Sequence, residues 1–529
     1  MYSFEGDFRR HPVQSYRGAS KKESRDDIVR KAQEERRKRE LERKKEECAL
    51  RIEAFVRGCL ARKRIYRDLR SRFDELQKEV AAESGRGLTQ KEEVFLTLVQ
   101  WLVYFFRQQT DQKRLDWLAS FLMKNQKQIS SWRQENPAVW RRKLQWILHL
   151  SLRHLSQTGN HFLPLRLLEI FTQNESNAKE LFFFLIKRGY YTDLRRLLDQ
   201  RVPPVIDASP NPPTPLADCI YDLMVRPLAL IKDSAIDSPF TLSCLGALNG
   251  QVLSTPYSEQ VELFLLPALR QRTPNFPFKE LLAFLSRPEA SLEVPWTLYS
   301  ILYLGMRHLH WTDDPSSMAY LQVLSRLMRE FPCRSFLQMH YGSDEPSSDG
   351  EDEESTMEVD FSTDQHSSLE AQCLEMLNNP EQVKEIVLTV VRLPNPVTFH
   401  VASIAYGLLC YHSNAMHEYR LLQTLALQPL FLQKLWRHLH DGKSSASSSP
   451  NFYSQLKQLS SGINLNAEDS DGLIPLLASF PASLSILFLL LNDEELFGSP
   501  VKVKFSKLTI VTRSLIAFDE DRFGMFFGF

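Results

Sequence analysis

Apolar residues recur at helical spacing along most of this chain. For example, five residues lie at i, i+3, i+4, i+8 and i+11, on one face of an α-helix: Leu144, Ile147, Leu148, Leu152 and Leu155. No segment of useful length alternates apolar and polar residues as a half-buried β-strand does. We therefore predict an all-α protein whose helices form an α-solenoid-like array, although the sequence shows no fixed repeat period. Five tryptophans are expected in its core, namely Trp101, Trp117, Trp132, Trp140 and Trp146.

Residues 26–82 follow a different pattern, without proline and dense in Glu, Lys and Arg. Three pairs place an acid four residues before a base, the orientation that stabilises an exposed helix: Glu34 with Lys38, Glu35 with Arg39, and Glu40 with Lys44. The first half has few apolar residues, whereas an apolar stripe runs through the second half to Val80. We predict one long charged helix whose first half is solvated. The heptad-like spacing of the stripe is too brief to predict a coiled coil.

Residues 52–62 of this helix combine the apolar stripe with basic side chains. An IQ-type calmodulin-binding segment has an aliphatic residue, usually Gln next, then Arg-Gly and a closing base. Here Ile52, Arg57-Gly58 and Arg62 hold these places, while Glu53 replaces Gln. Calmodulin-like clamps bind basic amphipathic helices, so we predict that eight residues bind such a partner: Ile52, Phe55, Val56, Arg57, Gly58, Leu60, Arg62 and Lys63. The alternative is that this stripe docks on the rest of the protein, because Glu53 removes a hydrogen-bond donor.

The chain has no net charge, but its charges are unevenly spread. Residues 1–80 carry 24 basic and 16 acidic residues, a net charge of +8, and the remainder of the chain carries −8. A basic arm of this kind suits an acidic partner such as calmodulin. Its bases are interleaved with acids, which weakens the case for phosphate binding. We therefore predict no nucleic-acid partner, and RNA binding by the arm is the alternative.

The cysteines and the N-terminus indicate the compartment. Seven cysteines, none in a CxxC pair, argue against a disulfide framework and against a structural zinc site. The N-terminus has no apolar signal segment, so we expect the cytoplasm, the nucleus or both. The uncharged stretch Leu473–Leu491 is cut by Pro475 and Pro481. We predict a buried core helix there rather than a membrane span.

Motifs of catalysis are missing from the sequence. There is no phosphate-binding glycine loop, no metalloprotease helix and no hydrolase nucleophile elbow. His308 and His310 form an i,i+2 pair, as do His438 and His440, and residues two apart on a helix point to different faces. We therefore predict no metal, no cofactor and no catalytic residue.

An acidic segment interrupts the helical pattern. Nine acids lie between Gly342 and Asp360, which predicts a disordered insertion over 342–368. Ser348 is a candidate phosphorylation site because Glu351 supplies the acid at +3 that suits an acidophilic kinase; the alternative is a solvating loop. The predicted organisation is a disordered basic N-terminus at 1–25, the long helix at 26–82, an armadillo- or HEAT-like region at 88–341, the insertion at 342–368, a helical region continuing the array at 369–500, and a divergent tail at 501–529.

Several short blocks of sequence point to one family. Four are specific in order and spacing, namely residues 1–8 (MYSFEGDF), 18–23 (GASKKE), 33–40 (QEERRKRE) and the Arg57-Gly58 segment. Looser ones are residues 166–171, 188–191, the acidic insertion and 494–498. Together they resemble the N-terminal part of the HECT-type ubiquitin-protein ligases of subtype 3C. The likeness covers roughly residues 1–500 and is stronger at the start.

The resemblance implies an IQ segment, a large helical region and a C-terminal HECT domain whose cysteine carries ubiquitin as a thioester. It also implies extension of polyubiquitin chains on proteasome-bound substrates, with ubiquitin-pathway proteins and the proteasome as partners. The HECT domain has no counterpart in these residues, and the last cysteine, Cys410, lies in a helical pattern that predicts burial. We therefore expect a truncated isoform or fragment: the substrate- or proteasome-docking portion of such a ligase, without ubiquitin transfer by this chain alone. The alternative is a stand-alone helical scaffold that binds calmodulin or other protein partners.

Overall fold

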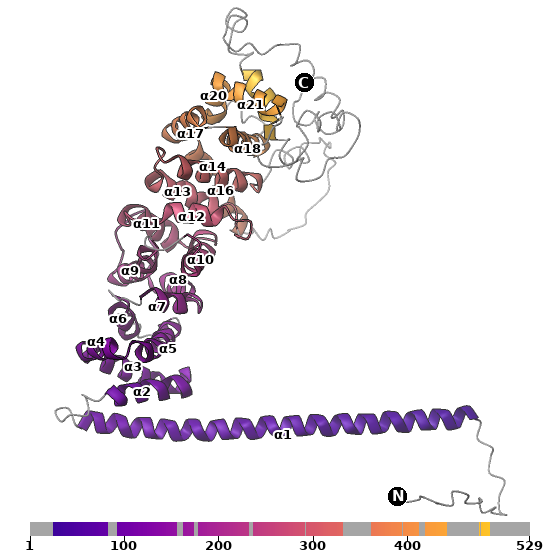
Figure 1. The fold of residues 1–529 in the computed structure, drawn as a ribbon, viewed down its shortest axis with the longest axis vertical. Coiled ribbons are helices and arrows are strands. Elements are labelled where there is room, and N and C mark those ends of the chain that lie inside the picture. The colour runs from indigo at the N-terminus through magenta and orange to yellow at the C-terminus, as the bar shows by residue number, and fades with distance from the viewer. Residues whose placement is uncertain are drawn as a thin grey trace, which may run out of the picture. The chain divides into compact units, whose positions relative to one another are not determined.

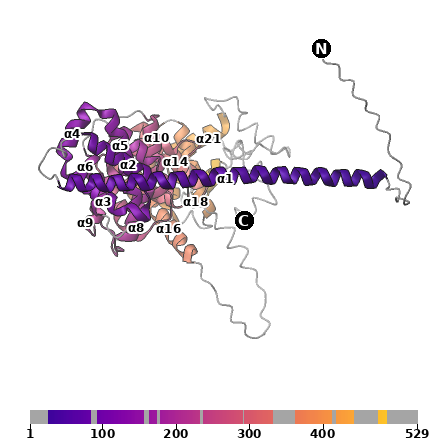
Figure 2. The same ribbon diagram turned by 90° about the horizontal axis from the view of Figure 1, so that it is seen from below.

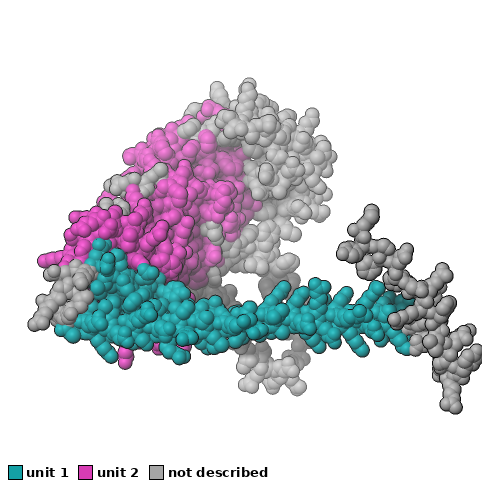
Figure 3. All heavy atoms as spheres, turned by 60° about the horizontal axis from the view of Figure 1, so that its bottom comes forward, with its two compact units in different colours: residues 1–107 teal, residues 108–529 magenta. Residues whose placement is uncertain are grey.

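The computed structural model describes residues 25–82, 92–155, 162–173, 178–231, 236–290, 292–331, 361–393, 395–411, 418–441, 475–476 and 478–486. Every regular element among these residues is a helix, so the prediction of an all-α protein is confirmed. The chain divides into two compact units, residues 1–107 and residues 108–529, which Figure 3 shows in teal and magenta.

The first unit contains α1 (Arg25–Ala82) and α2 (Glu92–Phe105). Figure 1 and Figure 2 both show α1 as one uninterrupted helix. Its 58 residues span about 87 Å at 1.5 Å per residue. Ion pairs on its exposed surface join residues four apart, at 3.2 Å for Arg39–Glu35 and 3.7 Å for Arg43–Glu47. Exposed pairs of this kind contribute only about 0.3–0.5 kcal/mol each, so the first half of α1 depends on local interactions rather than on packing.

The last third of α1 packs against α2. Phe73 of α1 is fully buried and meets Phe105 of α2 edge to face, with ring centroids 5.8 Å apart. Arg70 lies over the same Phe105 ring at 5.2 Å, and its Nη2 donates to the Phe105 carbonyl oxygen at 2.9 Å. That carbonyl is at the C-terminal end of α2, where the helix supplies no donor of its own. Arg70 therefore caps α2 and anchors α1 to it.

The second unit is an array of helices. Its members are α3 (Gln108–Lys124), α4 (Gln126–Glu135), α5 (Pro137–Leu155), α6 (Phe162–Phe171), α7 (Ala178–Ile186), α8 (Tyr190–Arg201), α9 (Pro215–Ala229), α10 (Pro239–Leu248), the π-helical turns η2 (Asn249–Leu253) and η3 (Val261–Leu265), α11 (Leu266–Arg272), α12 (Phe278–Leu285), α13 (Trp296–His308), α14 (Asp314–Arg329), α16 (Phe361–Leu377), α17 (Pro380–Arg392), α18 (Asn395–Tyr411), α20 (Arg420–Ala426) and α21 (Pro429–Asp441). Helices close in sequence pack together, as α5 does on α6 and α7, and α17 on α18 and α20 (Figure 1). Such neighbour-to-neighbour packing is typical of an α-solenoid-like array.

Several helices of this unit begin with the same sequence signal, a hydroxyl or amide residue followed by proline. Thr214 precedes Pro215, and its side chain accepts from the backbone N–H of Ala217 at 3.2 Å. Ser238 before Pro239 and Asn379 before Pro380 cap α10 and α17 in the same way. Proline suits the first helical position because its missing N–H would have no intrahelical partner there, and the capping oxygen satisfies one of the free N–H groups. A chain with 28 prolines can therefore remain helical.

A proline inside α9 changes the hydrogen bonding around it. Pro227 has no N–H to offer the carbonyl oxygen of Leu223, four residues earlier. The hydroxyl of Tyr190 on α8 donates to that oxygen instead, at 2.8 Å. The neighbouring Tyr191 donates to the Met224 carbonyl oxygen at 3.1 Å. Both tyrosines are buried, so these two bonds join α8 to α9 within the core.

Gly407 sets the spacing between α14 and α18. A Cβ atom at this position would lie 2.7 Å from the carbonyl oxygen of Met328. Only a residue without a side chain permits this approach between the two helices.

Some expectations from the sequence are corrected. α16 begins at Phe361, so residues 361–368 are helical rather than part of a disordered insertion. Trp140 is fully buried as expected, but Trp146 is 41% exposed, and Trp101, Trp117 and Trp132 are half-buried. The spacing of apolar residues does not predict α4 or α10. α10 contains apolar residues on more than one face and therefore shows no clear period.

The uncharged stretch near the C-terminus packs against the array where it is described. Residues 475–476 and 478–486 are helical, and Leu476, Phe480 and Ile486 are buried. Ser479 Oγ donates to the Ala402 carbonyl oxygen of α18 at 2.9 Å. The prediction of a buried helix is confirmed for these residues. None of the described helices has the length and apolar character needed to cross a membrane. Residues 1–24, most of the insertion and the tail at 501–529 lie outside the described residues.

Candidate functional site

The predicted calmodulin-type segment lies in the exposed part of α1. Its large apolar side chains are exposed by 63% at Ile52, 68% at Phe55, 45% at Val56 and 59% at Leu60. The predicted basic residues Arg57, Arg62 and Lys63 are exposed as well. A contiguous apolar surface that faces solvent is characteristic of an interaction site. The structure therefore keeps the eight predicted residues together on one exposed stretch of helix.

The change from exposed to packed helix occurs one turn after this segment. Tyr66 meets Tyr104 of α2 edge to face, with ring centroids 5.5 Å apart. The guanidinium of Arg107 lies over the Tyr66 ring at 5.7 Å. Lys63, the last residue of the predicted segment, is still exposed. The segment is therefore next to the α1–α2 contact without belonging to it.

Both predicted arginines already have weak partners within α1. Arg57 Nη2 lies 3.4 Å from Glu53 Oε1, and both side chains are mostly exposed. Arg62 Nη2 donates to Cys59 Sγ at 3.4 Å. The unusual Glu53 therefore engages the arginine of the Arg-Gly pair inside the helix. Exposed pairs are worth about 0.2–1 kcal/mol, so a partner that presents carboxylates can displace this contact.

Gly58 has no packing role among the residues that the structure describes. A Cβ atom there would meet only the end of the Arg62 side chain, with the nearest atom at 3.5 Å, which is ordinary contact. Glycine inside a helix costs about 1 kcal/mol relative to alanine. Gly58 therefore weakens α1, and no contact within the described part of the chain compensates for this cost. A partner whose backbone approaches the helix at this point would supply the reason for a glycine.

The alternative is that the apolar stripe of α1 docks on another part of the same chain. Within the described residues of the first unit, no side chain covers the apolar stripe of Ile52 to Leu60. Docking of the stripe on the second unit stays a prediction.

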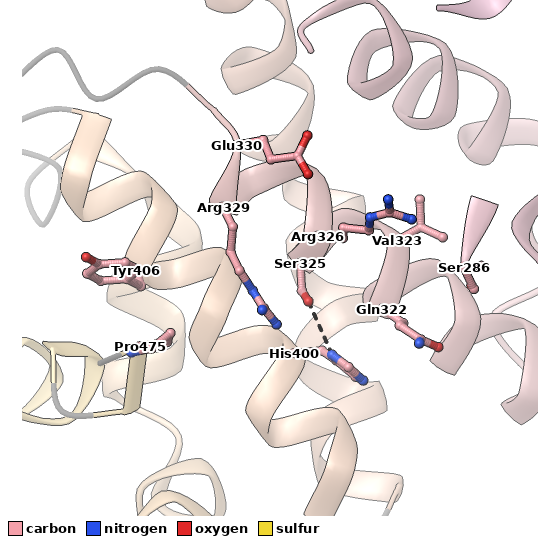
Figure 4. Close-up of a pocket in the computed structure, with 10 residues that line it drawn as sticks. All are labelled: Ser286, Gln322, Val323, Ser325, Arg326, Arg329, Glu330, His400, Tyr406 and Pro475. Carbon is pink, nitrogen blue, oxygen red and sulfur yellow. Dashed lines mark hydrogen bonds between the residues drawn. The ribbon is translucent and has the colours of Figure 1, made fainter. Parts of the chain in front are cut away.

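A separate cavity of about 700 Å³ lies between α14 and α18 (Figure 4). Ser325 Oγ and His400 Nδ1 are 3.2 Å apart on its wall. Arg326 donates to the carbonyl oxygens of Leu285 and Arg287, at 3.1 and 2.7 Å, and so caps the end of α12. Burial, together with the positive charge of Arg329, lowers the pKa of His400 to about 4. A histidine that is neutral at pH 7 and an arginine committed to backbone groups suit hydrogen bonding rather than acid–base catalysis.

Sequence reasoning misses this cavity for a plain reason. Ser325 and His400 lie 75 positions apart in the chain, and neither belongs to a recognisable motif. Only the pairing of α14 with α18 brings them together.

Three of the described cysteines, Cys219, Cys244 and Cys373, are poorly suited to carry a thioester. Burial raises the pKa of Cys219 to about 11 and that of Cys244 to about 12. Burial also raises the pKa of Cys373. Thiols with a raised pKa contain little thiolate at neutral pH, and the thiolate is the nucleophile. Cys410, which the sequence predicts to be buried, is only half-buried on α18.

Among the described side chains, the other candidate residues do not form a site; the side chains of His438 and His440 lie outside this description. His308 Nε2 lies 3.1 Å from the Leu269 carbonyl oxygen, and its ring stacks on Phe276, so it is a packing residue. No cluster of His, Cys, Asp and Glu among the described residues is suited to hold a metal ion. Ser348, the predicted phosphorylation site, lies outside the described residues.

No protein-family model matches this chain, and no solved structure matches it. The likeness to HECT-type ligases therefore depends on the short sequence blocks.

Proposed function

We propose that this chain is a docking protein of the ubiquitin pathway, in which α1 presents an IQ-like helix to a calmodulin-like partner. The exposure of the stripe from Ile52 to Leu60 carries the first part of the proposal. A helix with apolar residues on one face and bases around it is the form that clamp-like partners enclose. Gly58 adds support because a partner that surrounds the helix also contacts the face opposite the stripe.

The link to ubiquitin is supported by the sequence blocks that resemble HECT-type ligases. In this proposal the chain is the non-catalytic portion, and the helical array of the second unit docks substrates or the proteasome. The raised pKa values of Cys219, Cys244 and Cys373 agree with a role that requires no thiolate.

Calorimetric titration of the full chain with calmodulin tests the first part. We expect binding that weakens at least tenfold when Ile52→Glu and Phe55→Glu are combined, because two charges would enter the apolar contact. The matched control combines Val29→Glu and Leu41→Glu. These positions are 50% and 54% exposed on the same helix but lie outside the segment. No binding by the wild-type chain, or equal losses in both double variants, would contradict the proposal.

Two assays test the ubiquitin part. Incubation with activating enzyme, conjugating enzyme and ubiquitin, followed by a non-reducing gel, is expected to give no reducible ubiquitin adduct. An adduct that disappears in Cys410→Ala would refute a non-catalytic role. The chain is also expected to capture proteasomes from a purified preparation. If it binds calmodulin but neither proteasomes nor ubiquitin-pathway enzymes, the stand-alone scaffold is the correct description.

A further inference from the structure

A cluster of aromatic and basic side chains lies where α5 meets the end of α7, far in sequence from the IQ-like segment. We name it the Trp146 cluster and define it as Trp146, His149, Phe184, Lys187 and Arg188. Trp146 is 41% exposed, the only tryptophan among the exposed large apolar side chains of the described residues. Lys187 and Arg188 are exposed beside it. Exposed tryptophan next to arginine is the composition found at the energetic centres of protein interfaces.

The rings hold one another in place. Trp146 meets Phe184 edge to face with centroids 5.4 Å apart, and His149 lies 6.1 Å from Trp146. The Arg188 guanidinium covers this group, at 3.7 Å from the Phe184 ring and 5.1 Å from the Trp146 ring. Lys187 lies over Phe183 at 4.1 Å. Cations stacked on aromatic rings are already held in place. Lys187 and Arg188 therefore lose little side-chain entropy when a ligand binds them.

The polar groups of the Trp146 cluster have no counter-charge within the described part of the chain. Among the described residues, neither Lys187 nor Arg188 makes an ion pair, and the Trp146 indole N–H makes no hydrogen bond. The buried Nδ1 of His149 has no hydrogen-bond partner within the described ranges either. Burial lowers the pKa of His149, and the positive charges of Arg188 and Arg153 lower it further. The cluster therefore combines free donors with an excess of positive charge.

A purely structural role explains only part of these observations. Basic residues at the end of α7 interact favourably with the helix dipole, and Arg188 Nη1 donates to the Phe184 carbonyl oxygen at 3.4 Å. Gly189 then ends the turn with φ of 91°. This accounts for Lys187 and Arg188. It does not account for an exposed Trp146 on the neighbouring helix, with Arg142 exposed one turn before it on the same face.

We propose that the Trp146 cluster binds an acidic segment of a partner protein, a peptide that carries a carboxylate beside an apolar or aromatic residue. The carboxylate accepts hydrogen bonds from the Arg188 guanidinium and from the Trp146 indole N–H. The apolar residue packs on the exposed face of Trp146. His149 positions Trp146 from beneath and does not touch the ligand.

A protein partner fits these residues better than a nucleic acid. A nucleic acid needs a row of free cations to follow its repeating phosphates. Arg141 on α5 is already paired with Glu180, which leaves Arg142, Lys187 and Arg188 as exposed cations near Trp146 among the described residues. The free positive charge is therefore local, which suits one or two carboxylates.

Fluorescence anisotropy with the full chain tests the proposal. The probe is a fluorescein-labelled peptide of alternating glutamate and phenylalanine. Trp146→Ala and Arg188→Gln are each expected to weaken binding at least tenfold, and Trp146→Phe, which keeps a ring but loses the indole N–H, by a smaller factor. The matched control is Arg329→Gln. Arg329 also ends a helix and lies over an aromatic ring, Phe399 at 5.7 Å, but it is not beside an exposed tryptophan.

Other measurements separate binding from folding and from nonspecific attraction. Thermal unfolding of each variant is compared with the wild type, and Arg188→Lys keeps the charge if Arg188→Gln fails to fold. Equal weakening in Arg329→Gln would show nonspecific attraction and overturn the proposal, as would unchanged binding in Trp146→Ala. Displacement of the peptide by single-stranded RNA at lower concentration than by unlabelled peptide would assign the cluster to nucleic acid instead. The double Ile52→Glu and Phe55→Glu variant is expected to bind the probe normally, so this result is independent of the calmodulin proposal.

Discussion

Tyr190 donates a hydrogen bond of 2.8 Å to the carbonyl oxygen of Leu223, the group that Pro227 leaves without an intrahelical donor. The tyrosine is fully buried, so no water replaces its hydroxyl readily. A helix defect in α9 is thus repaired by a side chain from α8. Tyr190 and Pro227 can each be substituted without changing the other.

Tyr190→Phe is expected to lower the free energy of unfolding by about 1–3 kcal/mol, because it leaves a buried carbonyl oxygen unsatisfied. Pro227→Ala restores an N–H to that oxygen. In the Pro227→Ala background, Tyr190→Phe should therefore cost clearly less. Urea unfolding of the wild type, the two single variants and the double variant gives the coupling energy between Tyr190 and Pro227. Equal costs in the two backgrounds would show that the hydroxyl does not substitute for the missing helix bond.

Gly58→Ala is expected to have opposite effects on helix stability and on binding. It should stabilise the helical state of α1 by about 1 kcal/mol, the difference in helix propensity between glycine and alanine. The new Cβ makes only ordinary contact with Arg62, so no strain opposes this gain. It should weaken calmodulin binding, because the methyl group lies where the partner approaches. Circular dichroism measures the first effect and calorimetry the second. Stronger binding in the alanine variant would show that the partner does not approach this side of the helix.

Glu53→Gln is expected to strengthen calmodulin binding severalfold. It frees Arg57, which lies 3.4 Å from the Glu53 carboxylate, and it adds an amide donor at the position that is usually Gln. The pair is exposed, so its loss should cost about 0.2–1 kcal/mol of helix stability at most. Arg39 and Glu35 form a comparable pair at 3.2 Å, which makes Glu35→Gln the matched control. If Glu53→Gln and Glu35→Gln change the affinity equally, the effect comes from the net charge of α1 and not from the contact between Glu53 and Arg57.

Acid should destabilise the second unit through His400. Burial and Arg329 lower its pKa from 6.5 to about 4, so the folded state favours the neutral ring. Its contribution is fully present above about pH 6.5 and is lost as the pH falls towards 4. The full shift corresponds to at most about 3 kcal/mol.

The measurement is urea unfolding at pH 7 and pH 5, with His400→Asn as the control. Asp193 acts in the opposite direction, since burial raises its pKa to about 6 and its contribution is lost as the pH rises through that value. The difference between wild type and His400→Asn isolates the histidine. If both chains lose the same stability on acidification, His400 is not the responsible group.

The fold class and the long helix follow from the sequence because both depend on local patterns. The acid–base spacing of α1 and the 3.6-residue period of segments such as Leu144 to Leu155 are properties of neighbouring residues. The cap residues before Pro215, Pro239 and Pro380 are local as well. α10 escapes prediction because its apolar residues show no clear period, and α16 starts earlier than its polar first turns suggest.

The sites that depend on distant contacts are not predictable in this way. The sequence places the IQ-like residues on one face, but the anchor that leaves them exposed involves Arg70 and Phe105, which are 35 positions apart. The sequence shows Lys187 and Arg188 only as a basic end of a helix. Their role beside Trp146 appears when α5 and α7 pack together. An exposed tryptophan cannot be told from a core tryptophan by spacing alone.

The division of α1 into an anchored end and an unsupported end makes its order sensitive to ionic strength. From Arg25 to about Lys63 the helix is maintained by single-turn ion pairs, which dissolved salt screens, and isolated helices are marginal in water. Amide protons in this part should exchange with solvent faster than those near Phe73, and faster still as salt is added. When a partner binds residues 52–63, part of the binding free energy is used to keep this stretch helical. The measured affinity therefore depends on the helix–coil equilibrium of α1 as well as on the contacts with the partner.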